Sequence, residues 1–138
     1  MSTIYLLDTN TISYIAKGRS PAARMRLESL APDEKACISS ITEAELRYGL
    51  ARRPQAHALH AAVDGMLLKL QILPWDTGDA AAYGELRASL EAKGISLAEL
   101  DMLIAAQAVA HQAVLVTTDK AFAQVAALHR IQNWATDI

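Results

Sequence analysis

The sequence contains a single cysteine, Cys37, and this scarcity excludes an internal disulfide and any zinc site built on cysteine ligands. The four histidines are not spaced as HExxH, so nothing indicates a histidine metal site. We expect Cys37 to be a small buried side chain. We expect the histidines to lie on helix surfaces: His57, His60, His111 and His129.

Long hydrophobic runs are missing as well. No segment approaches the roughly 18 uncharged apolar residues that span a bilayer, and the N-terminus lacks the basic region and cleavage site typical of a signal peptide. We therefore expect a cytoplasmic protein without a membrane partner. Apolar side chains make up 52% of the 138 residues, enough to form the core of one domain over residues 1–138.

The chain also lacks a positive net charge. Its formal charge is −2, so a nucleic-acid partner would have to use local basic clusters. Two clusters exist, in "KGRSPAARMR" and "RYGLARRP", although such runs are usually solvated helix faces. Their cations are Lys17, Arg19, Arg24, Arg26, Arg47, Arg52 and Arg53.

Short apolar runs alternate with helical patterns along the whole chain. "TIYLL", "ACIS", "QILPW" and "VLVTT" predict strands, with "IQNW" as a possible fifth. The runs are continuously apolar, which is typical of a parallel sheet covered on both faces. The sequence therefore predicts a doubly wound α/β fold of three layers, α/β/α, with four to five parallel strands. Pro74 lacks an amide donor and places "QILPW" at a sheet edge or a strand end.

Two aspartates follow predicted strands. Asp8 ends the first apolar run and Asp119 follows "VLVTT". Because the carboxyl ends of parallel strands line a common crevice, both side chains should lie at the same end of the sheet. A structural role is also open, since Asp8 or Asn10 suits the N-cap of a helix in "TISYIAKG". Asp76 follows a strand too, and we assign it to a helix cap.

The predicted helix in "SLAELDMLIAAQAVA" supplies another acid. Asp101 lies beside its packed side, where an unpaired charge is costly. Glu99 fits the third position of a capping box opened by Ser96, which is a sufficient local role. The packed side is marked by Leu97, Leu100, Ile104, Ala105 and Ala108.

The helix in "SSITEAELRYG" offers two glutamates. Glu43 fits a capping box opened by Ser40 and an ion pair with Arg47 four residues later. Glu45 should flank the sheet-facing side, although a capping box with Thr42 would also explain it. We favour Glu45 for chemistry.

Four acids, Asp8, Glu45, Asp101 and Asp119, are therefore expected near one crevice. Like charges at close range raise each other's pKa values unless a cation neutralises them. Oxygen-only ligands select a hard ion such as Mg²⁺ or Mn²⁺, which activates water and stabilises a phosphate-centred transition state. The pattern favours metal-dependent phosphodiester cleavage over the alternative of four unrelated surface or capping acids.

At these residues the chain resembles the PIN-domain ribonucleases, and within them the VapC-type toxins of type II toxin–antitoxin systems. The resemblance rests on "LLDTNTIS", "SSITEAELRYG", "DMLIAAQAVAH" and "LVTTDKAF" followed by "NW", in this order over nearly the whole chain. It implies a PIN-like fold and an Mg²⁺-dependent (or Mn²⁺-dependent) endoribonuclease whose product carries a 5′-phosphate. Asp8 and Asp101 would hold the metal, with Asn10 nearby. Glu45 and Asp119 would position a second ion or the attacking water.

The resemblance also implies partners. Relatives cleave structured RNA such as tRNA or a ribosomal RNA loop, form homodimers, and are silenced by a VapB-type antitoxin whose tail enters the acidic groove. An acidic crevice needs cations nearby to hold RNA. Our RNA-binding candidates are Arg24, Arg26, Arg47 and Arg52.

The sequence is less compatible with two other phosphoryl-transfer functions. A haloacid-dehalogenase phosphatase needs DxDxT, but Asn10 stands at its third position. A response-regulator receiver would use Asp76 as phosphoacceptor and Lys120, but Asp76 follows an edge-like strand. The alternative that stays open is a non-toxin PIN nuclease, or a non-catalytic RNA-binding module, on the same fold.

Overall fold

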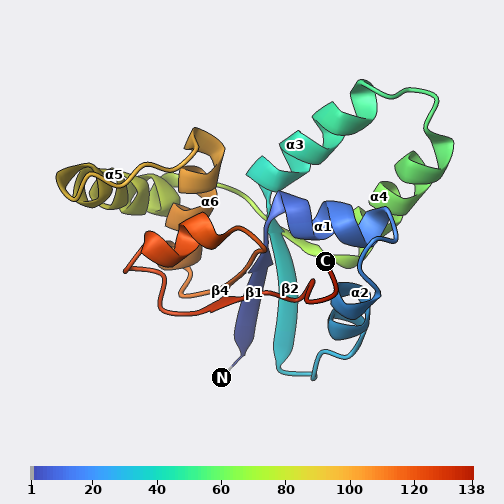
Figure 1. Ribbon diagram of the computed structural model, residues 1–138, viewed down its shortest axis with the longest axis horizontal. Helices are drawn as coiled ribbons and strands as arrows, with labels where there is room; N and C mark the ends of the chain where they lie inside the picture. The colour runs from blue at the N-terminus through green and yellow to red at the C-terminus, as the bar shows by residue number, and fades with distance from the viewer. Residues whose placement is uncertain (1) are drawn as a thin grey trace.

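The computed structural model describes residues 2–138 and shows one sheet of parallel strands with helices on both faces (Figure 1). The strand order is β3-β2-β1-β4-β5, so the predicted α/β class and parallel sheet are confirmed. The strands are β1 (Thr3–Leu7), β2 (Glu34–Ser39), β3 (Gln71–Leu73), β4 (Val114–Val116) and β5 (Ile131–Gln132).

Six α-helices and one short 3-10 helix, η1, connect the strands. The segment after β4 forms only the short helix η1 at its start. Within residues 2–138, no helix combines the length and the apolar character that a bilayer crossing needs. The helices are α1 (Thr9–Ala16), α2 (Pro21–Glu28), α3 (Ser40–Ala51), α4 (His57–Lys69), α5 (Thr77–Ala92), α6 (Glu99–Ala110) and η1 (Lys120–Gln124).

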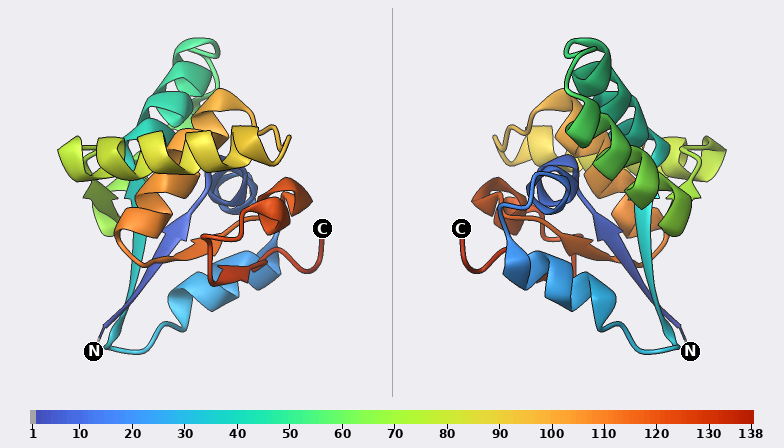
Figure 2. Two further views of the ribbon diagram at one scale, coloured as in Figure 1. Left: turned by 90° about the vertical axis from the view of Figure 1, so that its left-hand side faces the viewer. Right: turned by 90° about the vertical axis from the view of Figure 1, so that its right-hand side faces the viewer.

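Alternate residues of the central strand β1 pack into two separate cores. Leu6 points into the core that α5 and α6 cover, together with Phe122 of η1. Tyr5 and Leu7 point into the opposite core, which is closed by α1 to α4 (Figure 2). Because both faces are covered, every β1 residue from Tyr5 to Leu7 is buried, as the continuous apolar run predicts.

The strand order places a switch point beside β1. The chain leaves β1 to form β2 on one side, and β4 later pairs with β1 on the other. In such sheets the crevice for functional groups lies outside the carboxyl ends of the strands at this point. At the opposite edge β3 is the last strand, and Pro74 directly follows it. The edge placement of Pro74 is therefore confirmed.

Two structural predictions are confirmed on the α5 side and at β2. Asp76 is the N-cap of α5 and forms a reciprocal capping box with Asp79. Cys37 is buried, and burial raises the pKa of its thiol, as expected for an inert small side chain.

Two predicted capping boxes are wrong. Helix α6 begins at Glu99 with Ala98 as its N-cap and no side-chain cap, so Ser96 and Glu99 do not form one. At α3 the cap is Ser39, whose hydroxyl accepts the amide of Ile41, while the hydroxyl of Ser40 accepts the Trp75 amide.

The predicted packed side of α6 is also partly wrong. Leu100 is 43% exposed, because it lies in the first turn, before the helix enters the core. The positions Ile104, Ala105 and Ala108 are buried as predicted.

Candidate active site

Asp8 lies at the carboxyl end of β1 and is almost fully buried, with 5% of its surface exposed. Its Oδ1 accepts the amide of Thr11 at 2.9 Å, so it is the N-cap of α1. Its Oδ2 accepts the hydroxyl of Thr117 at 2.5 Å. The capping role and a place at the crevice are therefore compatible in one residue, because each carboxylate oxygen has a second lone pair.

Asp119 lies just beyond β4 and is exposed. Its Oδ1 caps η1 by accepting the Ala121 amide at 2.9 Å. Its own amide donates to the hydroxyl of Thr117 at 3.0 Å. Thr117 therefore connects Asp8 to Asp119. Sequence reasoning missed this residue, although it stands in "LVTTD" between two strand-end positions.

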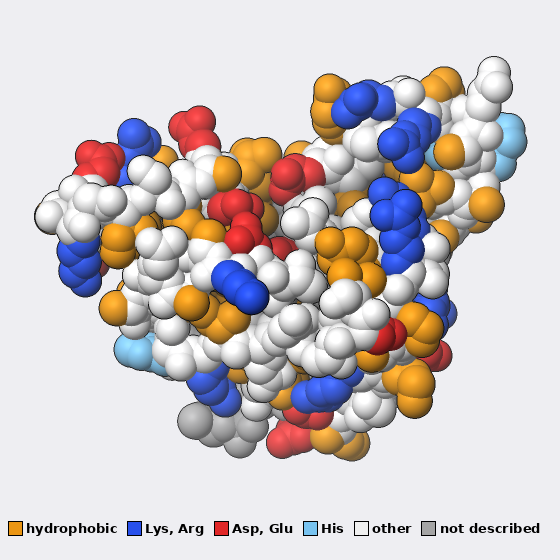
Figure 3. Space-filling model, in the orientation of Figure 1, with side chains coloured by type: hydrophobic (Ala, Val, Ile, Leu, Met, Phe, Trp, Pro, Cys, Tyr) orange, Lys and Arg blue, Asp and Glu red, His pale blue; other side chains and the backbone are white. Residues whose placement is uncertain are grey.

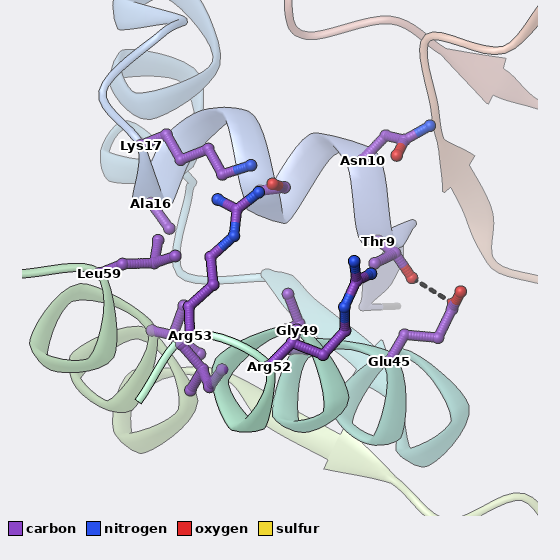
Figure 4. A pocket seen from close by; sticks show the side chains of 13 residues that line it. Thr9, Asn10, Ala16, Lys17, Glu45, Gly49, Arg52, Arg53 and Leu59 are labelled. Atoms are coloured by element: carbon purple, nitrogen blue, oxygen red, sulfur yellow. Dashed lines mark hydrogen bonds between the residues drawn. The ribbon is translucent and has the colours of Figure 1, made fainter. Parts of the chain in front are cut away.

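Glu45 faces the N-terminus of α1. The hydroxyl of Thr9 donates to Glu45 Oε1 at 2.6 Å and also lies 3.3 Å from the hydroxyl of Thr42 (Figure 4). Glu43 instead pairs with Arg47 at 3.2 Å on the outer side of α3. The two glutamates therefore have the separate environments that the helix pattern predicted. Thr9 is the second site residue that sequence reasoning missed.

Asp101, in the first turn of α6, interacts electrostatically with the other three acids. Partial burial raises its pKa, and the negative charges of Asp119, Asp8 and Glu45 raise it further. Burial also raises the pKa of Asp8, with a smaller contribution from the charge of Asp119, while hydrogen bonds from Thr117 and Thr11 oppose the rise. Figure 3 shows acidic side chains gathered in the hollow between α6 and α3. Side chains from four separate segments thus meet at the switch point.

The donor set fits a hard divalent cation. Within residues 2–138, no three side chains of the metal-binding types close around one ion as they stand. Mg²⁺ does not require such a cage, because it commonly takes one or two carboxylates and keeps several waters or substrate phosphates. Asp8 and Asp101, whose pKa values are raised, also gain from a nearby cation. The residues therefore fit Mg²⁺ or Mn²⁺ held by one or two of the acids.

The four candidate arginines lie in different places. Arg26 lies over the rings of Tyr5 and Trp134, which contact each other, and its guanidinium is 3.6 Å from Glu34. Glu34 pairs with the first residue of β1, at the opposite end of the sheet from Asp8. Arg24 donates to the carbonyl of Ile15. Arg47 is paired with Glu43. Arg52 alone of the four lines the same cleft as Glu45, and Asn10 lines it too.

Comparison with known proteins shows the family of this chain. Residues 5–128 match the PIN domain family. The chain belongs to the PIN domain family. This PIN domain is 36% identical over 132 residues to ribonuclease VapC2 of Rickettsia felis, covering 95% of this chain and 98% of that protein. It is 33% identical over 131 residues to the tRNA(fMet)-specific endonuclease VapC of Salmonella typhimurium, covering 94% and 97%.

The fold of this PIN domain has close matches among solved structures. The crystal structure of VapBC2 from Rickettsia felis, bound to a DNA fragment from their promoter, superimposes with a TM-score of 0.89. The two chains are 35% identical, and the match covers 96% of this chain and 99% of the other. The resemblance to VapC proteins that the sequence motifs predicted is therefore confirmed.

Proposed function

We propose that the protein is a metal-dependent endoribonuclease and the toxin of a VapBC-type toxin–antitoxin pair. The observation that carries this proposal is the placement of acids from four segments around the strand ends: Thr117 joins Asp8 to Asp119, and Thr9, next to Asp8, binds Glu45. The raised pKa of Asp101, which the charges of the other three acids increase, supports the same grouping. Relatives named ribonuclease and endonuclease, similar over nearly the whole chain, support the same activity.

In this proposal the chain's own residues hold the ion and the water. Asp8 and Asp101 hold Mg²⁺, and hydrogen bonds from Thr11 and Thr117 fix the Asp8 carboxylate. When bound, the ion supplies a Lewis acid beside the scissile phosphate. Asp119 completes the acidic pocket from the end of β4.

Glu45 is suited to orient the attacking water. Because Thr9 donates to its Oε1, the carboxylate is fixed and Oε2 is left to accept a proton from water. Attack of that water on phosphorus, with departure of the 3′ oxygen, leaves a 5′-phosphate on the product. Asn10 lines the same cleft as Glu45, which supports an assisting role at this site.

The partners follow from relatives rather than from this chain alone. A tRNA endonuclease and a VapBC complex are among its relatives, so we propose structured RNA such as tRNA or ribosomal RNA as substrate and a VapB-type antitoxin as partner. We also propose a homodimer in the cytoplasm. A non-toxin PIN nuclease with the same chemistry is the second candidate, and the presence of all four acids argues against a non-catalytic RNA-binding module.

The activity is tested with purified protein and unfractionated tRNA or ribosomal RNA. We expect cleavage in Mg²⁺ or Mn²⁺ and none in EDTA, because the acids repel both each other and the phosphate without a cation. Restoring Mg²⁺ after EDTA treatment should restore cleavage, which controls for damage by the chelator. Equal cleavage in EDTA would contradict the metal mechanism.

A further inference from the structure

A cleft of about 190 Å³ runs between α1 and α3, beside the acidic site (Figure 4). One face of each helix lines it, since the lining positions recur every three or four residues. On α1 it extends from Thr9 to Lys17, about 12 Å at the helical rise of 1.5 Å per residue. On α3 it extends from Glu45 to Leu50, and Arg52 and Arg53 follow the end of that helix. Leu59 and Val63 of α4 complete the lining.

Glu45 lies at one end of this cleft, and three cations line the rest of it. Lys17 is the C-cap of α1 and Arg52 the C-cap of α3, whereas Glu45 lies at the end nearer the other acids. In Figure 4, Arg53 points across the cleft toward Lys17, and Arg52 points toward the Thr9 end. Figure 3 shows the corresponding gathering of lysine and arginine side chains at the far ends of α1 and α3.

The three cations of the cleft are not neutralised by any ion pair within the described residues 2–138. Lys17, Arg52 and Arg53 are exposed, and among residues 2–138 no ion pair joins any of them to a carboxylate. Arg52 lies over the ring of Tyr48, with its Cζ 5.5 Å from the ring centroid. Like charges that face each other across a cleft repel, so an anion placed between them is favoured.

Gly49 keeps the middle of the cleft open. It lies inside α3, where glycine is unfavourable for a helix. A Cβ added there would meet no atom within 4 Å, so packing does not require glycine at this position. The consequence of its missing side chain is an unobstructed path from the cationic end to Glu45.

We propose that this cleft binds the RNA backbone next to the cleavage point, with Lys17, Arg52 and Arg53 contacting a neighbouring phosphate of the same strand. The inference rests on the proposed function, because the acidic end must receive the scissile phosphate. Since carboxylates repel the backbone, cations a short distance along the strand are needed to hold it. The cleft is smaller than the roughly 300–1,000 Å³ of pockets that enclose whole small ligands, which suits a narrow backbone.

A purely structural role for these cations has to be distinguished from RNA binding. Cations at helix C-termini stabilise the helix dipole, and this alone would explain Lys17 and Arg52. Lys93 provides a matched control, because it is the exposed C-cap of α5, forms no ion pair within residues 2–138, and does not line the cleft.

The binding test uses a labelled single-stranded oligouridylate in EDTA, so that no cleavage occurs. The triple variant Lys17→Gln, Arg52→Gln and Arg53→Gln is compared with the parent and with Lys93→Gln at about 50 to 200 mM NaCl. We expect the slope of log Kd against log salt to fall by about 0.7 in the triple variant, which is the value for one lost phosphate contact on a single strand. Lys93→Gln should keep the slope of the parent.

A second pair of variants tests the open path. Gly49→Leu should weaken oligouridylate binding and raise KM for tRNA cleavage while kcat is retained, because the lost contact lies away from the reacting phosphate. Gly84→Leu, at another exposed helical glycine with open space around it, should change neither quantity. Thermal melts establish that each variant is folded.

The inference is overturned if the parent does not bind the oligouridylate, or if the triple variant keeps the affinity and salt slope of Lys93→Gln. It is also overturned if the triple variant binds RNA normally but loses affinity for a protein partner, since the cleft would then accept acidic side chains. A parent that binds RNA yet cleaves none refutes the proposed function instead. If Gly49→Leu does not fold, the triple variant alone tests whether the cleft binds RNA.

Discussion

At the scale of single residues, Thr117 shows how a neutral side chain positions two acids. Its hydroxyl is buried, donates to Asp8 and accepts the amide of Asp119. Burial raises the pKa of Asp8, and the hydrogen bond from Thr117 opposes this rise by stabilising the carboxylate. Thr117 therefore helps to keep Asp8 charged, which a metal ligand requires.

Thr117→Val preserves the shape of the side chain but removes its hydroxyl. We expect a loss of about 1–3 kcal/mol of stability, because a buried carboxylate oxygen loses its donor. We also expect a smaller stabilisation by Mg²⁺ and slower RNA cleavage, since the pKa of Asp8 rises further. Thermal melts with and without Mg²⁺, run beside a cleavage assay, measure all three effects.

Thr118→Val is the matched control for this change. Thr118 is adjacent and half-buried, and its hydroxyl makes no hydrogen bond among residues 2–138. If both valine variants melt alike and respond alike to Mg²⁺, Thr117 does not position the acids.

At the scale of elements, α3 carries two glutamates with different surroundings. Glu43 forms an exposed ion pair with Arg47, one helical turn later. Glu45 accepts a hydrogen bond from Thr9, so it links α3 to the start of α1. The difference of two positions rotates the side chains to different sides of the helix. One glutamate therefore faces solvent and the other faces the crevice.

Glu45→Gln should abolish RNA cleavage, because the amide cannot accept a proton from water. Glu43→Gln should leave cleavage intact and cost only about 0.2–0.5 kcal/mol, which is typical of an exposed pair four residues apart on a helix. Cleavage rates and melting temperatures of the two variants are compared directly. If Glu43→Gln abolishes cleavage and Glu45→Gln does not, Glu43 and not Glu45 belongs to the active site.

Local sequence patterns predicted the elements better than their ends. The acids at Asp8 and Asp119 were found because strand ends in a parallel sheet share one edge. The capping box at Ser96 failed because Gly94, at a φ of +70°, ends α5, and Ile95 and Leu97 then pack against the core. Because that loop packs against the core, α6 begins only at Glu99. Caps depend on such tertiary contacts, which a short pattern does not contain.

The threonines of the site were missed for a related reason. Thr9 and Thr117 are ordinary residues in a sequence, and each acquires its role from a partner far along the chain. Thr9 contacts Glu45, and Thr117 contacts Asp8, which lies 109 positions away. A charged residue beside an apolar run, by contrast, can be identified as a candidate site residue from the sequence alone. Long-range hydrogen bonds therefore require the folded structure.

At the scale of the whole molecule, the small net charge is the sum of separate acidic and basic clusters. The formal charge is only −2, yet four acids gather at the switch point, and the cleft beside them is lined by three cations that form no ion pair among residues 2–138. Repulsion among the acids is a cost to the metal-free fold that a bound cation relieves. Global stability should therefore depend on both pH and Mg²⁺ through this one cluster.

The sign of the pH dependence follows from the direction of the pKa shift. Asp101 has a raised pKa in the folded protein, so the folded state holds its proton more tightly than the unfolded chain does. Its contribution to stability is fully present below the ordinary value of 3.8 and is lost as the pH rises through the raised pKa. Glu34 and Asp137 have lowered pKa values and act in the opposite direction, so a variant is needed to isolate the cluster.

Asp101→Asn is that variant, because it removes one charge with little change in shape. In metal-free protein at neutral pH we expect it to melt at the same temperature as the parent or higher. The difference should shrink as the pH falls to 3.8 and below, where Asp101 becomes protonated even in the unfolded chain. Stabilisation by Mg²⁺ should be smaller than in the parent, because binding to the folded state is weakened, and RNA cleavage should be lost. Melts across this pH range, with and without Mg²⁺, are run beside the cleavage assay. A structural Asp101 would behave differently: the variant would lose about 1 kcal/mol or more, keep its Mg²⁺ response and still cleave RNA, which would remove Asp101 from the site.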